Sequence, residues 1–185
     1  VGANGAGKTT LLRLIAGDRA DMRSLQEWEQ QLAEAAVPIV RARRQAVLRM
    51  HSLAQGHYAL ISGQPEEVLA LDYRGNSAQE EDIGGALLRQ LERTREDDVR
   101  RLATTVGPHR DDIAITLTGE ELRAFGSQGQ IRTAALAMRL SEIDILTDAQ
   151  GEPPILLLDD VLSELDLGRR QRLIGGLQHV QTLIT

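Results

Sequence analysis

The longest regular pattern in the chain is a series of apolar residues that recur every three or four positions. Its members are Leu25, Trp28, Leu32, Ala35, Ile39, Ala42 and Ala46. This spacing is typical of a helix that buries one seam against a partner. Pro38 falls inside the series, where its ring clashes with the preceding turn and one backbone hydrogen bond is lost. The pattern therefore predicts a long helix in two pieces that are divided near Pro38.

A short β-element and a second helix are predicted next. Between residues 57 and 72, turn residues precede alternating apolar positions that are typical of a strand. Residues 80–102 then form a helical pattern with four apolar residues on one side, Ile83, Leu87, Leu91 and Val99. Charges of alternating sign cover the rest of this helix. We expect it to be an exposed arm.

The last third of the chain alternates strands and helices. Strands are predicted over 113–117, 155–158 and 180–184, and helices over 131–146 and 167–177. The run from Ile155 to Leu158 has no polar position, which indicates a strand buried on both faces, as in a parallel sheet. An α/β fold is expected. Its segments are predicted at 1–21, 22–105 and 106–185.

Composition narrows the classes of protein. The 185 residues are 42% hydrophobic and 26% charged and contain no cysteine, which excludes disulfides and thiolate metal sites. No apolar run approaches the roughly 20 residues of a membrane span, so we expect a cytoplasmic protein with no membrane partner. Only four residues are aromatic, so base stacking of the kind that binds single-stranded nucleic acid is not expected to be the main recognition device. The net charge of −6 argues against a protein that coats nucleic acid along its whole surface. Contacts to phosphates would have to come from a local basic patch.

The clearest chemical motif lies at the start of the chain. Residues 2–9 read GANGAGKT, the spacing of a Walker A loop, and an apolar helical pattern follows at once. Glycine lets backbone amides approach phosphate oxygens, and the start of the helix attracts the anion. Lys8, the single lysine of the chain, would neutralise the outer phosphates, and Thr9 would offer a hydroxyl ligand to Mg2+. The predicted ATP contacts in this loop are Asn4, Gly5, Ala6, Gly7, Lys8, Thr9 and Thr10.

Two carboxylates end the apolar run in the last third. Asp159 and Asp160 follow Leu158, at the carboxyl end of a predicted parallel strand, where α/β folds bind ligands. This is the pattern of a Walker B strand. Asp159 is the predicted second ligand of the Mg2+ held by Thr9, and Asp160 is predicted to orient or deprotonate the attacking water. We therefore assign Lys8 and Asp160 as catalytic residues.

Three further segments leave alternatives open. Arg41, Arg43, Arg44 and Arg49 crowd one stretch of the long helix, where a solvated face and contacts to phosphates are weighed equally. The segment GPHRDD at 107–112 could hold a metal, but neighbouring residues on an extended chain point to opposite faces, which favours a structural or interface role. Ser127 and Gly129 open a helix and could bind an anion, although such a start is more often a simple cap.

The order of these motifs resembles the ATP-binding-cassette superfamily. Within it, the segments GPHRDD (107–112), SQGQIR (127–132) and EPPILLLDDVLSELD (152–166) are similar to the RecF family of DNA-repair proteins. The resemblance covers residues 25–185. Three features depart from it, one of which is that the switch residue expected just past the final strand is absent. Only about eight residues stand where a first lobe is expected between Gly17 and Leu25, and TLLRLIAG at 10–17 looks more like a transporter ATPase.

The resemblance implies a P-loop head of the ATP-binding-cassette type with a parallel-sheet core, into which a helical arm and a small β-element are inserted. It also implies that Ser127, Gly129 and Gln130 contact the γ-phosphate held by a second subunit, with Asp166 beside the nucleotide. The implied protein is a homodimer that forms with ATP and Mg2+, binds DNA at gaps or single-strand/double-strand junctions, and works with RecO and RecR proteins to load a recombinase. Hydrolysis is expected to be slow, because Asp160 is one methylene shorter than the usual glutamate. The alternatives are a transporter's nucleotide-binding subunit and a degenerate head without turnover.

Overall fold

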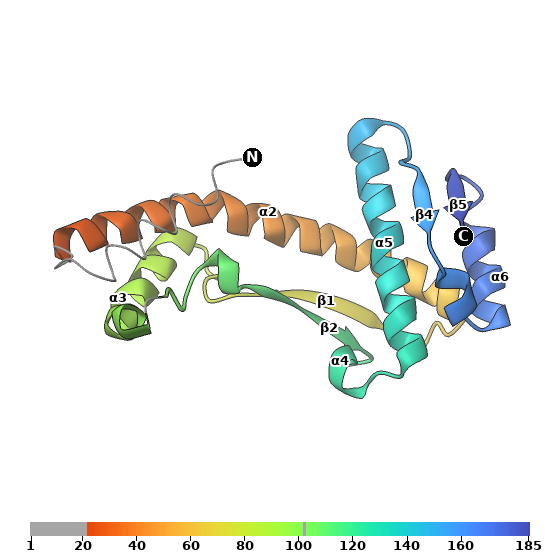
Figure 1. The fold of residues 1–185 in the computed structure, drawn as a ribbon, viewed down its shortest axis with the longest axis horizontal. Coiled ribbons are helices and arrows are strands. Elements are labelled where there is room, and N and C mark those ends of the chain that lie inside the picture. Colours follow the sequence, from red (N-terminus) through yellow and green to blue (C-terminus); the bar gives the residue numbers. More distant parts are fainter. Residues whose placement is uncertain (1–21, 102) are drawn as a thin grey trace. The chain divides into compact units, whose positions relative to one another are not determined.

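The computed structural model describes residues 22–101 and 103–185, with side chains from residue 25 onward. Figure 1 shows the elements along the chain. By its internal contacts the chain divides into unit 1, Val1–Arg44 with Tyr73–Asp112, and unit 2, Gln45–Asp72 with Ile113–Thr185. Each unit is described by itself. The predicted division into 1–21, 22–105 and 106–185 rests on motifs rather than packing and stays a prediction.

Helix α2 (Met22–Ser62) is continuous for 41 residues, with Pro38 inside it. The predicted division into two pieces is therefore wrong. Pro38 is exposed, so its ring needs no space in a packed interface. Its missing N–H removes one hydrogen bond, whereas the turns on either side keep theirs. A long helix accommodates such a residue by bending slightly.

The buried stripe of α2 also differs from the predicted seam. Buried apolar residues of the helix are Leu25, Ala33, Ala36, Val40, Val47, Ala54, Tyr58 and Ile61. Only Leu25 belongs to both sets. Ile39, at the centre of the predicted seam, is 43% exposed. The sequence offers small apolar residues on two neighbouring faces of the helix, so its packing partners decide which face is buried.

In unit 1, α3 (Ile83–Arg101) packs against the first half of α2. Their shared core is small and consists of Ala33, Ala36, Leu87, Leu91 and Val106. Val99, predicted on the buried side, is 42% exposed, while its neighbour Asp98 is only 5% exposed. Asp98 accepts hydrogen bonds from Thr94 and Thr105. The buried side of α3 therefore ends in a satisfied carboxylate rather than in an apolar residue.

A three-stranded sheet has the order β1 (Leu69–Arg74), β2 (Asp112–Leu117) and β3 (Glu120–Glu121). The strand predicted over 113–117 is confirmed as β2. The β-element predicted over 57–72 is correct only in its second part, because α2 continues to Ser62. Two side chains of α2 accept hydrogen bonds from backbone amides at the unpaired edge of β1. Leu69 N donates to Gln55 Oε1 at 2.5 Å, and Leu71 N donates to His51 Nδ1 at 3.0 Å. These contacts satisfy an edge that would otherwise expose unpaired amides.

Unit 2 contains the larger apolar core. It packs α5 (Gln128–Gln150) and α6 (Leu167–Gly176) against the parallel pair β4 (Leu156–Leu158) and β5 (Thr182–Ile184). The core residues are Ile61, Leu136, Leu140, Ile143, Leu158, Leu165, Leu173, Leu177 and Val180. The short helix α4 (Leu122–Phe125) precedes α5, and 3-10 turns occupy Pro108–Arg110 and Val161–Glu164.

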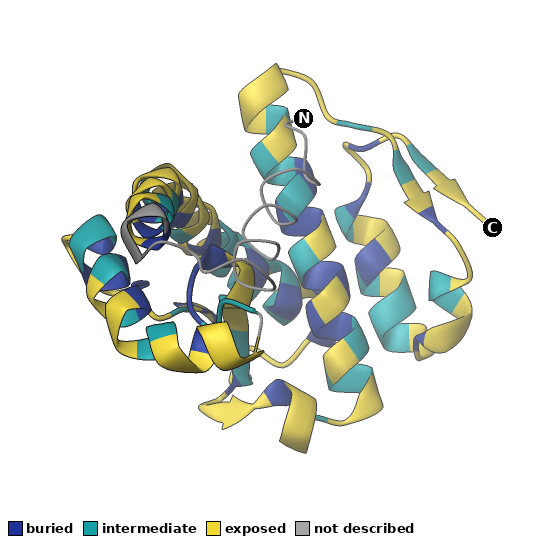
Figure 2. Ribbon diagram, turned by 60° about the vertical axis from the view of Figure 1, so that its left-hand side comes forward, coloured by how far each residue is buried: buried dark blue, intermediate teal, exposed yellow. Residues whose placement is uncertain are grey.

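The predicted parallel strand is confirmed as β4, which pairs with β5 in the register Leu157 to Leu183. Its predicted burial on both faces is wrong. Leu158 is 5% exposed, but Leu157 is 69% exposed. Figure 2 shows the buried residues gathered along the helices, whereas the two strands are largely exposed or intermediate. Only one face of this pair is covered by the described residues. None of the described helices is long and apolar enough to cross a membrane.

Candidate functional site

The start of α5 is held by a reciprocal cap. Ser127 is extended, and its Oγ accepts the backbone N–H of Gln130 at 3.2 Å. In return, Ser127 N donates to Gln130 Oε1 at 2.9 Å. The first amides of a helix have no partner within it. Those of Gln128 and Gly129 accordingly have no acceptor among the described residues. They are the groups that an anion at this helix start would meet.

The start of α6 lies close to the start of α5. Asp166 caps α6 by accepting Arg169 N at 2.9 Å, and this hydrogen bond holds the pKa of Asp166 below its ordinary value. The Arg169 guanidinium lies 3.4 Å from Asp166, and a Cβ added at Gly129 would stand 2.5 Å from its Nη1. Two predicted site residues, Gly129 and Asp166, are thus brought together by Arg169. The sequence offered only a weak signal for Arg169, an arginine-rich first turn of the helix predicted over 167–177.

An ion pair joins α5 to the turn before α6. Arg132 Nε lies 3.2 Å from Glu164 Oε2, and Arg132 Nη1 donates to the Glu164 carbonyl at 3.3 Å. Glu164 belongs to the turn Val161–Glu164 that leads from β4 to α6. Arg132 therefore joins the α5 start to the turn before α6, and Arg169 lies beside Gly129 without a hydrogen bond to α5 among the described residues. The free amides at the start of α5 therefore lie near the guanidinium groups of Arg132 and Arg169.

The two carboxylates after β4 lie at its carboxyl end, as predicted, and both are exposed. Asp159 Oδ1 accepts a hydrogen bond from Thr185 Oγ1 at 2.5 Å. Asp160 has the left-handed backbone conformation, with φ 53 and ψ 6, which is uncommon for a residue with a side chain. Its carbonyl accepts Ser163 Oγ at 2.7 Å, which helps to hold that turn.

This end of β4 suits a Mg2+ ion that takes most of its ligands from phosphates and water. Mg2+ is often bound by one or two carboxylates together with substrate phosphates. The second oxygen of Asp159 has no partner among the described residues. Within the same residues no cluster of three or more acidic or histidine side chains could hold a metal by itself. Asp159 therefore fits a shared ligand rather than a complete protein cage.

The predicted phosphate loop lies outside the described residues. Asn4, Gly5, Ala6, Gly7, Lys8, Thr9 and Thr10 all belong to it. Within the described residues, no recorded contact joins the carboxylates Asp159 and Asp160 to Ser127, Gly129 or Gln130. The described part of the site therefore consists of two separate groups, the α5 and α6 starts and the end of β4.

Two arginines of the crowded stretch on α2 bind backbone carbonyls of unit 1. Arg43 Nη1 donates to Pro108 O at 2.5 Å, and Arg44 Nη2 donates to Ser77 O and Glu80 O at 3.0 and 2.7 Å. Each of these two guanidinium groups thus already has a partner within unit 1. They hold the loops that flank α3.

The segment 107–112 is held in a similar way. His109 Nε2 lies 3.2 Å from the Thr104 carbonyl, and Asp111 accepts a hydrogen bond from the Tyr73 hydroxyl. Burial, followed by that hydrogen bond, raises the pKa of Tyr73. These contacts support the structural role that the sequence favours for this segment.

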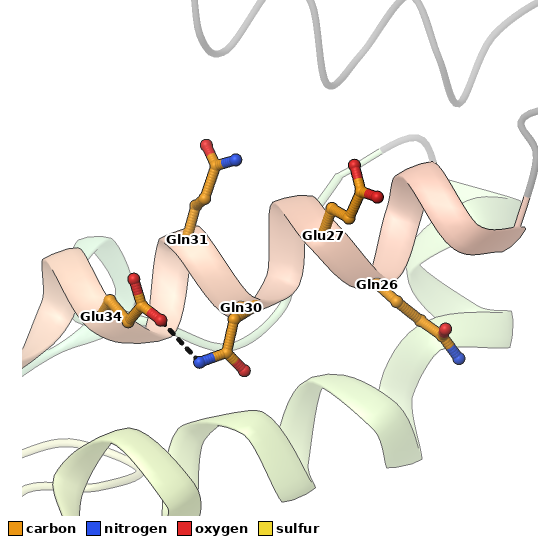
Figure 3. A pocket seen from close by; sticks show the side chains of 5 residues that line it. All are labelled: Gln26, Glu27, Gln30, Gln31 and Glu34. Carbon is orange, nitrogen blue, oxygen red and sulfur yellow. Dashed lines mark hydrogen bonds between the residues drawn. The ribbon is translucent and has the colours of Figure 1, made fainter.

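A shallow hollow follows an exposed flank of α2 (Figure 3). Its lining residues are Gln26, Glu27, Gln30, Gln31 and Glu34. Gln30 Nε2 donates to Glu34 Oε1 at 2.7 Å. Three amides and two carboxylates, with no cation among the described residues that line the hollow, do not suit a phosphate. The chemistry of this hollow gives no support for a nucleotide there.

The fold and the site together define a mixed α/β protein in which a capped helix start and an acidic end of a parallel strand are the candidate groups for binding. Comparison with known proteins makes this more specific. Over 183 residues the chain is 38% identical to the DNA replication and repair protein RecF of Ruminiclostridium cellulolyticum. The alignment covers 96% of this chain and 49% of that protein. It is 42% identical over 171 residues to RecF of Rippkaea orientalis, with 90% and 45% covered.

Solved structures agree. A structure of the recombination mediator protein RecF-ATP in the RecFOR pathway matches with a TM-score of 0.82 and 32% identity, over 97% of this chain and 48% of that one. A second structure, of RecF-ATPrS, matches with a TM-score of 0.83 and 34% identity. No family model matches the chain. The resemblance is thus confirmed: the chain is related, along most of its length, to the RecF family of DNA replication and repair proteins.

The chain spans about half the length of the curated relatives that it matches. The aligned stretch of 183 residues is little longer than the 96% of this chain that it covers. The alignment therefore contains no insertion as large as the first lobe that the resemblance leads us to expect between Gly17 and Leu25. The match is to one stretch of a RecF protein, and the role of the loop at 2–9 stays a prediction.

Proposed function

We propose that this chain is part of a RecF-type protein that binds ATP and DNA in recombinational repair. One observation carries the proposal: similarity to RecF proteins extends over 90% or more of the chain and includes a solved structure of RecF with ATP. The curated relatives reported above are RecF proteins, which gives no support to the transporter alternative. Because the chain spans about half of these relatives, the activity belongs to the whole protein.

In this proposal ATP joins two copies of the protein. One copy holds the phosphates with the loop that contains Lys8, and the other presents the start of α5 to the γ-phosphate. The free amides of Gln128 and Gly129 and the nearby guanidinium of Arg169 support the second role, because both attract an anion. The lack of a recorded contact between the α5 start and Asp159, within the described residues, is compatible with two groups that act from different copies.

Of the two carboxylates after β4, one would bind the metal ion and the other would orient the attacking water. Asp159 and Thr9 would bind Mg2+, which when present neutralises charge on the outer phosphates. Asp160 would orient the attacking water. Its shorter side chain reaches less far than a glutamate, and misplacement of a general base sharply lowers the rate. We therefore propose a weak ATPase whose hydrolysis ends a long-lived dimer.

DNA at gaps or single-strand/double-strand junctions and mediator proteins of the RecO and RecR type are the proposed partners. The relatives are named DNA replication and repair proteins, and the solved structures belong to the RecFOR pathway, which supports this class of partner. Arg43 and Arg44 are not proposed as contacts to phosphates, because their guanidinium groups bind carbonyls of unit 1. Replacing them should alter folding more than the slope of DNA affinity against salt concentration.

The oligomeric state of the intact protein tests the proposal. Light scattering should show a dimer with ATP and Mg2+ and a monomer with ADP. Ser127→Arg should abolish the dimer, because a long side chain would occupy the position of the γ-phosphate. Ser52→Arg, the same change at an exposed position of α2, is the matched control and should leave the dimer intact. A dimer that ignores the nucleotide, or that survives Ser127→Arg, would contradict the proposal.

The two candidate catalytic residues are tested separately. Lys8→Ala should weaken ATP binding in calorimetry by about 1.5–3 kcal/mol, the loss of a charged hydrogen bond. Asp160→Asn should retain ATP and Mg2+ yet slow single-turnover hydrolysis by about 10² to 10⁴ and prolong the dimer. A protein that binds ATP and dimerises but never hydrolyses it would instead be the degenerate head.

A further inference from the structure

The side chain of Gln130, which completes the cap of α5, is itself held from outside the helix. Gln130 Nε2 donates to Glu67 Oε1 at 2.7 Å. The other carboxylate oxygen, Glu67 Oε2, accepts the hydroxyl of Tyr58 at 2.7 Å. Glu67 lies between α2 and β1, and Tyr58 lies in the last turns of α2. All three residues belong to unit 2.

Tyr58 is the fixed end of this chain of hydrogen bonds. Its side chain is among the largest fully buried ones, and its residue is 0% exposed. Burial and the bond to Glu67 raise the pKa of the Tyr58 hydroxyl, so the group stays protonated and donates at physiological pH. Gln64 adds to the same carboxylate when its amide nitrogen faces Glu67, at 2.9 Å from Oε1. Glu67 is thereby held by donors from two directions.

Both polar atoms of the Gln130 amide have a partner as a result. Its oxygen accepts Ser127 N at 2.9 Å, while its nitrogen donates to Glu67. A planar amide bound at both ends keeps one orientation, whereas one bound only at its oxygen can turn out of the cap. Loss of Glu67 would therefore loosen the very turn whose free amides face the end of the helix.

We propose that Glu67 is a positioning residue that sets the start of α5 for nucleotide-dependent dimerisation by holding the amide of Gln130 against the buried Tyr58. This inference rests on the proposed function, because the α5 start is the surface through which the second copy binds ATP. Glu67 itself does not touch the nucleotide. Its effect should thus appear in the dimer and not in the binding of ATP to a single copy.

The test compares Glu67→Ala with two variants in the intact protein. Glu67→Ala should weaken the ATP-dependent dimer by about tenfold or more, measured by sedimentation, since a hydrogen bond to a charged group is lost. ATP binding to the monomer should change less than twofold. Glu67→Gln should restore most of the dimer, because its amide oxygen still accepts from Gln130 and its amide nitrogen can donate to the Tyr58 hydroxyl. Glu66→Ala, the same change at the exposed neighbour, should match the wild type.

A second readout does not depend on dimerisation. Hydrogen exchange of the monomer over residues 127–131 should become several-fold faster in Glu67→Ala and stay unchanged in Glu66→Ala. Exchange and dimerisation that both match the wild type would overturn the proposal. The proposal would also be overturned if Glu67→Ala weakened ATP binding to the monomer as much as it weakened the dimer. The same holds if Glu67→Ala failed to fold and Glu67→Gln failed to restore the dimer. A wild-type protein that ignores ATP but shows the exchange difference would refute the proposed function and retain the positioning of α5.

Discussion

The two units of the chain are stabilised in different ways. Unit 1 has a small core of two alanines, two leucines and a valine, and a nearly buried ion pair between Glu29 and Arg95 lies in the same unit. Unit 2 has a core cluster of nine buried apolar residues. Its ion pairs, such as Arg49 with Asp148, are mostly exposed. Charge should therefore matter most in unit 1, and apolar volume in unit 2.

The difference has a simple origin in side-chain size. Alanine buries little apolar area, and hydrophobic stabilisation scales with that area at about 25 cal/mol per Å2. A helix pair with an alanine-rich contact gains less from burial, so the pairing of its polar groups becomes decisive. Burying two charges is costly in itself, and removing one partner costs more still, because it leaves the other charge uncompensated. Four substitutions, from the largest expected effect to the smallest, test this contrast.

Glu29→Gln should be the most damaging change. Arg95 Nε and Nη2 donate to Glu29 at 2.9 and 2.5 Å, and the two side chains are 17% and 9% exposed. The neutral amide leaves the Arg95 guanidinium uncompensated, at a cost of about 3–5 kcal/mol. Urea denaturation measures this loss in the free energy of unfolding. Glu27→Gln, at an exposed position of the same helix, should change stability by less than about 0.5 kcal/mol; equal effects would remove the special role of charge in unit 1.

Leu173→Ala should come next and should act on unit 2. Leu173 is 1% exposed in the core of α5, α6 and β4, so its truncation leaves a cavity that costs about 2–4 kcal/mol. The control is Leu167→Ala in the same helix, where the side chain is 67% exposed. Thermal unfolding should separate the two variants clearly. Similar midpoints would mean that the apolar cluster does not carry the stability of this unit.

Asp98→Asn should have a moderate effect in unit 1. The carboxylate accepts three hydrogen bonds, from Thr94 Oγ1, Thr105 N and Thr105 Oγ1. An amide nitrogen in place of one oxygen would face a donor, at a cost of about 1–3 kcal/mol. Asp97→Asn removes only an exposed pair with Arg100 and serves as the control in the same denaturation series. A silent Asp98→Asn would show that this buried carboxylate can be replaced.

The smallest effect concerns pH and the start of α6. The pKa of Asp166 is lowered in the folded protein, chiefly by the hydrogen bond from Arg169 N. A lowered folded pKa stabilises the fold above the unfolded value, near 4, and this contribution is lost as pH falls through the lower folded value. Carboxyl NMR should find Asp166 titrating below an ordinary aspartate. Asp166→Asn should flatten the acid limb of the stability curve slightly, and an ordinary pKa would contradict the cap.

The sequence alone was sufficient for most of the elements and for the family. The segments SQGQIR and EPPILLLDDVLSELD by themselves indicate the RecF family, since they combine a helix start, an acid-ended apolar run and a turn in a fixed order. The positions of Asp159 and Asp160 after a parallel strand followed from the apolar run itself. The cap by Ser127 was also predictable, because a serine three residues before a glutamine is a local pattern. These features depend on neighbours in sequence, which is why reading the chain recovers them.

Only the tertiary structure decided which faces are buried and which side chains meet. The stripe of α2 lies mainly on a face other than the predicted one, because alanines occur on both faces and the partners choose between them. Arg43 and Arg44 bind carbonyls that lie more than 30 positions away in the sequence, so no local pattern predicts their role. The same holds for Glu67 and Gln130, which are 63 positions apart. Periodicity describes one element at a time, whereas burial and long-range hydrogen bonds depend on where a second element packs.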